Sequence, residues 1–204
     1  TMPGGKEVLV AVSKAEEAYA FDPDQGGRLV WRLKLGKGSR TAGTWGIAAD
    51  DRRVYVGSAD VKPAPGVEVG GLSAVDAATG TIVWHTPAPP AACFWGSATS
   101  ALARANGAVG CTQAQPGALA AVPGAVFSGS IDGHIRAFST DDGKVLWEFD
   151  AGRSFPAVNG VTATGGSISN GAEAVADGML FVNAGSGGVH QPGNALIAFS
   201  IDGN

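Results

Sequence analysis

The segment that decides the fold reads GLSAVDAATGTIVW and spans residues 71–84. Alternating apolar residues at both ends predict two short strands, and the Thr-Gly pair between them predicts the turn of a β-hairpin. The same design recurs as AFDPDQGGRLVW at 20–31, with one extra turn residue, and as AFSTDDGKVLW at 137–147. A fourth copy, AFSIDGN at 198–204, stops within its turn. The chain is therefore a repeat protein whose unit contains a hairpin, ending in tryptophan in the three complete copies.

The composition fits a protein made of strands and turns. Of the 204 residues, 32 are glycine and 11 are proline, which are unfavourable inside helices and common in turns. The net charge of −4 provides no basic face, so nucleic acid is not an expected partner. No stretch of about 18 uncharged apolar residues occurs, so we expect no membrane span. The first residues, TMPGGK, lack an apolar signal core, so we expect either a cytoplasmic chain or the removal of a leader.

Each of the four hairpins is preceded by one further predicted strand, and the last three are preceded by two. The nearer one lies at 8–12, 53–58, 125–130 and 179–184, and an innermost strand is predicted at 46–50, 116–123 and 172–178. Four strands form one blade of a β-propeller, so the predicted fold is all-β. We expect a single partial β-propeller over 1–204, with blades at roughly 1–40, 41–90, 114–152 and 168–204 and a long insertion at 85–115.

The predicted blades are incomplete at both ends of the array. The first lacks its start, and the last stops within its hairpin. Unpaired strand edges invite pairing with another chain. We therefore expect the remaining blades to come from the same polypeptide or from another chain.

Both cysteines, Cys93 and Cys111, lie in the long insertion. A disulfide between them would restrain a loop rich in glycine and alanine, and an exported protein can keep such a bond. Two separate buried thiols are the alternative, because two cysteines do not define the compartment.

The motif Ala-x-Asp-x-x-Thr-Gly-x-x-x-Trp, complete at 74–84, resembles the tryptophan-docking repeat of quinoprotein dehydrogenases. Segments 44–50, 123–134 and 192–199 extend this likeness to the C-terminal half of polyvinyl-alcohol dehydrogenase-like proteins, a periplasmic branch of that family. The resemblance covers nearly the whole chain. It implies part of an eight-bladed, periplasmic or secreted propeller that binds pyrroloquinoline quinone (PQQ) and Ca²⁺. It also implies oxidation of secondary alcohols such as polyvinyl alcohol, with cytochrome c as the electron acceptor.

The resemblance gives two roles to the tryptophans. Trp31, Trp84 and Trp147 would dock between neighbouring blades, where a buried indole needs one partner for its N–H. Trp45 would form the floor on which PQQ stacks, and Gly46 would let the cofactor approach closely. Trp45 as another packing residue is the alternative.

The resemblance also indicates three polar candidates. Asp60 follows a predicted strand where relatives carry an asparagine that ligates calcium, although a loop aspartate also forms turns. Arg136 could pair with a PQQ carboxylate, or it could be a solvated strand side chain. Asn159 could face the central cavity, but Asn-Gly is also a turn sequence.

Two departures from the alcohol dehydrogenase pattern weaken the prediction of an enzyme. No carboxylate occurs in residues 85–96, where that branch places its catalytic aspartate, so no general base is assigned. Ile131 stands where that branch has a lysine or arginine. The alternative function is a cofactor-free propeller that acts as a periplasmic interaction scaffold.

Overall fold

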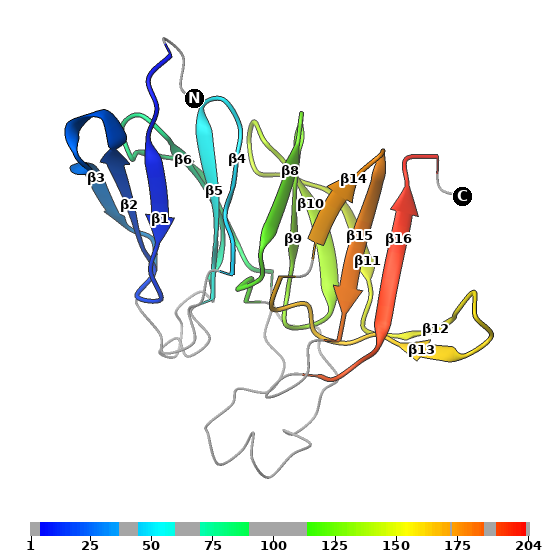
Figure 1. Cartoon of the computed structure of the whole chain (residues 1–204). Helices are drawn as coiled ribbons and strands as arrows, with labels where there is room; N and C mark the ends of the chain where they lie inside the picture. The colour runs from blue at the N-terminus through cyan, green and yellow to red at the C-terminus, as the bar shows by residue number, and fades with distance from the viewer. Residues whose placement is uncertain are drawn as a thin grey trace, which may run out of the picture.

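The computed structural model describes residues 5–36, 45–59, 70–89, 114–171, 173–185 and 191–202. Within these segments the regular structure is antiparallel sheet plus one 3-10 turn, η1 (Pro23–Gln25). Figure 1 shows the blade-like sheets side by side in chain order, from the blue sheet of β1–β3 to the sheet that ends in red β16. The predicted all-β propeller class is confirmed.

The blades have the following strands. The first blade contains β1 (Leu9–Val12), β2 (Glu17–Asp22) and β3 (Arg28–Lys34). The second contains β4 (Ala48–Ala49), β5 (Arg53–Ser58), β6 (Gly71–Asp76) and β7 (Ile82–Pro87). The third contains β8 (Leu119–Val122), β9 (Ala125–Gly129), β10 (His134–Ser139) and β11 (Val145–Asp150). The fourth contains β14 (Glu173–Ala176), β15 (Met179–Ala184) and β16 (Ala195–Ser200).

The geometry of the hairpin turn in the second blade follows from its aspartate and glycine. In the second blade, Asp76 Oδ1 accepts hydrogen bonds from the amides of Ala78 (3.0 Å) and Thr79 (2.9 Å). The Gly80 amide donates to the Asp76 carbonyl at 2.9 Å, and Gly80 has φ +73°. An Asx turn closed by a left-handed glycine is thus encoded locally.

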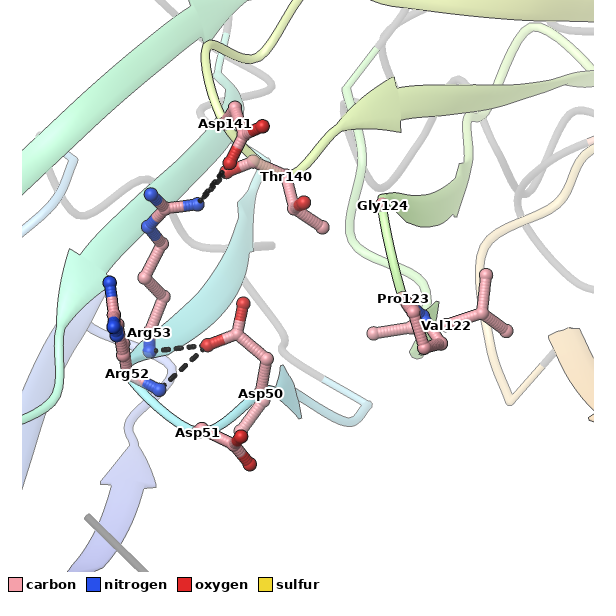
Figure 2. A pocket seen from close by; sticks show the side chains of 11 residues that line it. Asp50, Asp51, Arg52, Arg53, Val122, Pro123, Gly124, Thr140 and Asp141 are labelled. Carbon is pink, nitrogen blue, oxygen red and sulfur yellow. Dashed lines mark hydrogen bonds and ion pairs between the residues drawn. The ribbon is translucent and has the colours of Figure 1, made fainter. Parts of the chain in front are cut away.

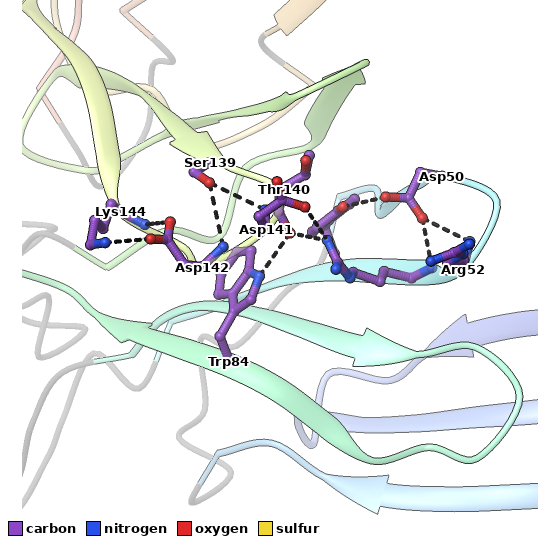
Figure 3. Close-up of polar contacts among 10 residues, drawn as sticks. Asp50, Arg52, Trp84, Ser139, Thr140, Asp141, Asp142 and Lys144 are labelled. Atoms are coloured by element: carbon purple, nitrogen blue, oxygen red, sulfur yellow. Dashed lines mark hydrogen bonds and ion pairs between the residues drawn. The ribbon is translucent and has the colours of Figure 1, made fainter.

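The tryptophans of the first two repeats, Trp31 and Trp84, connect their blade to the hairpin turn of the next blade. Trp31 Nε1 donates to the Ala77 carbonyl at 2.9 Å, and Trp84 Nε1 donates to the Thr140 carbonyl at 2.9 Å (Figure 3). The Trp31 ring lies so close to Gly80 that a Cβ there would be 2.7 Å from it. The turn glycine therefore permits both the left-handed backbone and the docking of the indole.

Aromatic rings fill the interface between the third and fourth blades. Trp147 meets Phe199 edge-on at 5.0 Å, and Phe149 meets the same ring at 4.9 Å. A hairpin of β12 (Ser154–Pro156) and β13 (Thr162–Thr164) follows β11 and projects beyond β16 (Figure 1). Its Phe155 stacks on Phe149 at 6.0 Å, and the Arg153 guanidinium lies over both rings. The β12–β13 hairpin therefore packs against the third blade as well as connecting it to the fourth.

Candidate functional site

The innermost strands are neighbours, since β8 contacts both β4 and β14. The segments that lead into these strands are joined by backbone hydrogen bonds. The Trp45 amide donates to the Pro116 carbonyl at 3.4 Å, and the Ala118 amide donates to the Asn170 carbonyl at 2.9 Å. We call residues 45–47, 115–118 and 168–171 the inner lip. It is the entrance to the three inner strands.

Trp45 is the large aromatic group on this lip. Its exposed fraction is 61%, whereas the docked Trp31 is 9% exposed. Gly46 lies close to the third blade, because a Cβ on it would be 3.1 Å from the Ala118 Cβ. An exposed indole beside a close backbone approach is a surface on which a flat ring system could stack.

Arg136 lies elsewhere, buried at 2% exposure within the third blade. Its Nη2 is 2.7 Å from Glu148 Oε1 and 3.5 Å from Asp132 Oδ2, and its Nη1 donates to Ser130 Oγ at 2.9 Å. Burial raises the pKa of Asp132, but hydrogen bonds from His134 and Ser130 and the Arg136 charge lower it to about 2. The guanidinium is therefore committed to an internal ion-pair network.

Asn159 lies at the tip of the β12–β13 hairpin. Its Oδ1 accepts a hydrogen bond from the Val161 amide at 3.1 Å, and Gly160 beside it has φ +78°. These are the contacts of a turn-forming asparagine. The structure therefore places Asn159 on the projecting hairpin and away from the inner lip.

The predicted Ca²⁺ ligand and the two cysteines of the predicted disulfide fall in segments that the structure does not describe. Asp60, Cys93 and Cys111 lie outside the described residues. In the described segments, no group of three or more His, Cys, Asp or Glu side chains could hold a metal ion.

A polar groove of about 530 Å³ separates the second and third blades (Figure 2). It lies at the β4–β5 and β8–β9 turns, at the far end of β4 from the inner lip. Its lining residues are Ala49, Asp50, Asp51, Arg52, Arg53, Ala121, Val122, Pro123, Gly124, Thr140 and Asp141. Sequence reasoning did not single this groove out, although the consecutive charges at 50–53 were a visible signal.

The charged side chains of Asp50 and Arg53 in the groove already make hydrogen bonds and an ion pair within the protein. Asp50 Oδ1 accepts from the amides of Arg52 (2.8 Å) and Arg53 (2.7 Å), as Figures 2 and 3 show. Burial raises the pKa of Asp50, but these bonds and one from Tyr55 hold it below its usual range. Arg53 Nη1 lies 3.4 Å from Asp141 Oδ1 and donates to the Thr140 carbonyl. These contacts of Arg53 link the second blade to the third across the groove.

The fold and the docked tryptophans define the class: a β-propeller of tryptophan-docked blades. A family model described as outer membrane protein assembly factor BamB, PQQ_2, matches residues 14–191. The chain belongs to this PQQ_2 family.

Two curated relatives are both called polyvinylalcohol dehydrogenase. The one from Pseudomonas sp is 39% identical over 214 residues, which cover 100% of this chain and 32% of the relative. The one from Sphingopyxis sp. (strain 113P3) is 35% identical over 216 residues, covering 99% and 31%. The predicted resemblance is confirmed, and the chain spans about a third of the length of these relatives.

Solved structures agree on the fold. BamB from Moraxella catarrhalis has a TM-score of 0.59 at 18% identity, covering 98% of this chain and 48% of that one. A quinohemoprotein alcohol dehydrogenase from Comamonas testosteroni has a TM-score of 0.59 at 17% identity, covering 96% and 32%. Among the described residues, no helix has the length and apolar character needed to cross a membrane.

Proposed function

We propose that this chain forms part of a PQQ-dependent dehydrogenase that oxidises secondary alcohols such as polyvinyl alcohol. The observation that carries the proposal is the exposed Trp45 on the inner lip, with Gly46 against Ala118. The relatives named polyvinylalcohol dehydrogenase, at 39% and 35% identity, support the choice of substrate. A periplasmic or secreted location and a cytochrome c partner belong to the same proposal.

Among the described residues, those of the inner lip are the ones that would contact PQQ. Trp45 would hold one face of the cofactor, and Gly46 allows the third blade to approach beside it, since a Cβ there would lie 3.1 Å from the Ala118 Cβ. When bound, the quinone supplies the acceptor for the hydride of the alcohol carbon. Arg136 and Asn159 are assigned no part in holding it, because the ion pairs and turn contacts above account for them. Asp60 remains our proposed Ca²⁺ ligand.

The alcohol O–H proton also needs an acceptor. The sequence has no aspartate or glutamate between Asp76 and Asp132. Asp132 and Glu148 are both paired with Arg136. We therefore assign no general base, and propose that the described residues bind and orient the reactants.

The second candidate is a cofactor-free propeller that serves as a periplasmic scaffold. The observation that favours it is the match of residues 14–191 to the family model described as BamB. In that case Trp45 would be a contact for a protein partner.

Equilibrium dialysis of PQQ, with and without Ca²⁺, separates the two candidates. It should use the chain within its complete polypeptide together with Trp45→Ala and Trp45→Phe. Loss of a stacked aromatic contact worth about 0.5–1.5 kcal/mol should weaken binding roughly two- to twelvefold in Trp45→Ala. Trp45→Phe, which keeps an aromatic face, should lose less. Binding that is absent from the unaltered protein would favour the scaffold, and binding equal in all three proteins would remove Trp45 from the site.

A further inference from the structure

Glu173 occupies a position that the neighbouring blade fills with an apolar residue. On β14 it pairs with Val182, just as Leu119 on β8 pairs with Ser128. The next pairs, Ala174 with Phe181 and Ala120 with Phe127, keep the same register. Leu119 is buried in the apolar cluster between the second and third blades. Glu173 therefore places a carboxyl group where the repeat favours an apolar side chain.

The carboxyl group is buried, and the only donors acting on it, the backbone amides of Gly129 and Glu173, lie outside good hydrogen-bonding geometry. Neither oxygen is exposed, and neither has a partner within hydrogen-bonding geometry. Its Oε1 lies against Gly129, where a Cβ would approach within 2.6 Å, and Ile168 lies against the same glycine. Burial raises the pKa of Glu173 to about 8, and the backbone amides of Gly129 and Glu173 offset only part of this effect.

No described charge faces this carboxyl group from the elements packed around it. Strands β8 (LAAV), β9 (AVFSG) and β15 (MLFVNA) and residues 166–171 (GSISNG) contain no ionisable side chain. The other residues of β14 are alanine and valine. Arg136 and Asp132 belong to the separate network around Glu148. Within the described residues, therefore, an ionised Glu173 would have no counter-charge.

A short series of contacts links Glu173 to the candidate cofactor site. Asn170, just before β14, accepts the Ala118 amide at 2.9 Å. Ala118 in turn lies close to Gly46, beside Trp45, since a Cβ on Gly46 would be 3.1 Å from the Ala118 Cβ. A displacement of the start of β14 would therefore reach the inner lip through one hydrogen bond and the close approach of Ala118 to Gly46.

We propose that Glu173 is a proton-binding site that controls the inner lip. With its proton, it packs as a neutral group between the third and fourth blades. Without it, the bare carboxylate draws water into the interface, shifts β14 and loosens the Asn170–Ala118 bond beside Trp45. This inference does not depend on cofactor binding, since the proton is the only ligand.

The test is a pH titration from pH 6 to 9.5, on the same polypeptide as the PQQ experiment, with two readouts. Infrared absorption of the protonated carboxyl C=O stretch, after ¹³C labelling of glutamate, reports the proton itself. Tryptophan fluorescence, assigned with Trp45→Phe, reports the lip. We expect both to change together with a midpoint near pH 8, the pKa of Glu173. The variants Glu173→Gln and Glu173→Leu, which are neutral at every pH, should lose both changes.

The matched control is Asp202→Asn, an exposed turn residue of the same blade, which should keep both transitions. A labelled carboxyl that titrates entirely near the ordinary glutamate pKa of about 4.3 would refute the site in the unaltered chain, whether or not the variants fold. A fluorescence transition that survives in Glu173→Gln, or a carboxyl transition near pH 8 without any change at Trp45, would refute the coupling to the lip.

Discussion

The double role of the turn glycine gives a sharp stability prediction, because the chain contains its own control. Gly80 and Gly27 each donate an amide hydrogen bond at 2.9 Å to the aspartate that opens their turn. Both are left-handed, with φ +73° and +79°. A Cβ at Gly80 would lie 2.7 Å from the Trp31 ring, whereas a Cβ at Gly27 would meet nothing within 4 Å. Alanine therefore adds backbone strain at both sites and overpacking at only one.

The expected costs follow from these two contributions. A left-handed alanine costs about 1–2 kcal/mol, which is the whole expected effect of Gly27→Ala. Overpacking against an indole adds about 1–3 kcal/mol, so Gly80→Ala should lower the free energy of unfolding by about 2–5 kcal/mol in total. Urea denaturation followed by circular dichroism measures both values. Equal losses in the two variants would refute the docking argument.

A double-mutant cycle tests the contact directly. Trp31→Phe removes part of the ring that a Cβ at position 80 would meet. The Gly80→Ala and Trp31→Phe double variant should therefore be more stable than the sum of the single losses, by about 0.5–3 kcal/mol. Strict additivity would mean that alanine is strained at position 80 for reasons unrelated to Trp31.

Two further predictions concern single polar contacts. Trp84→Phe keeps an aromatic ring but loses the N–H bond to the Thr140 carbonyl, so the urea midpoint should fall by an amount equivalent to about 1 kcal/mol; an unchanged midpoint would show that this bond adds nothing. The hydrogen bond to Asp132 raises the pKa of His134 above 6.5, so the stability it gives is complete below pH 6.5 and is lost as the pH rises through the folded pKa. Melting temperatures at pH 5.5 and 8.5 measure this contribution, and the difference between them should be smaller in His134→Gln than in the unaltered chain. An equal difference in the two proteins would contradict this assignment.

The hairpin repeat could be predicted from sequence because its chemistry is local. An aspartate that accepts nearby amides and a glycine with positive φ determine the turn within a few residues, as Asp76 and Gly80 show. Trp31, Trp84 and Trp147 recur at the same place within the outer strands β3, β7 and β11. The sequence predicted that each docked indole N–H has one hydrogen-bond partner, but it did not identify the carbonyls of Ala77 and Thr140 as those partners.

The candidate site was harder to predict because burial depends on register across strands and blades. Arg136 was predicted to bind a PQQ carboxylate or to be a solvated strand side chain, and its pairing opposite Glu148 could not be seen in the sequence. Asn159 was correctly associated with a turn sequence, but the protrusion of its hairpin needed the packing of Phe155 on Phe149. Glu173 was read as part of an inner strand. Its unusual position became visible only when that strand was aligned with Leu119.

The two ends of the inner strands differ in how far their polar groups are already satisfied. At the β4–β5 turn, Asp50 accepts hydrogen bonds from two backbone amides. Arg53 donates to a backbone carbonyl and pairs with a neighbouring carboxylate. At the inner lip, Trp45 remains exposed and the Glu173 carboxyl remains unpaired. A buried polar group without a partner costs stability and calls for an explanation, of which a role in binding is one. The lip is therefore the end at which a ligand or a proton can change the state of this protein, and the tied turns keep the blades in place while it does so.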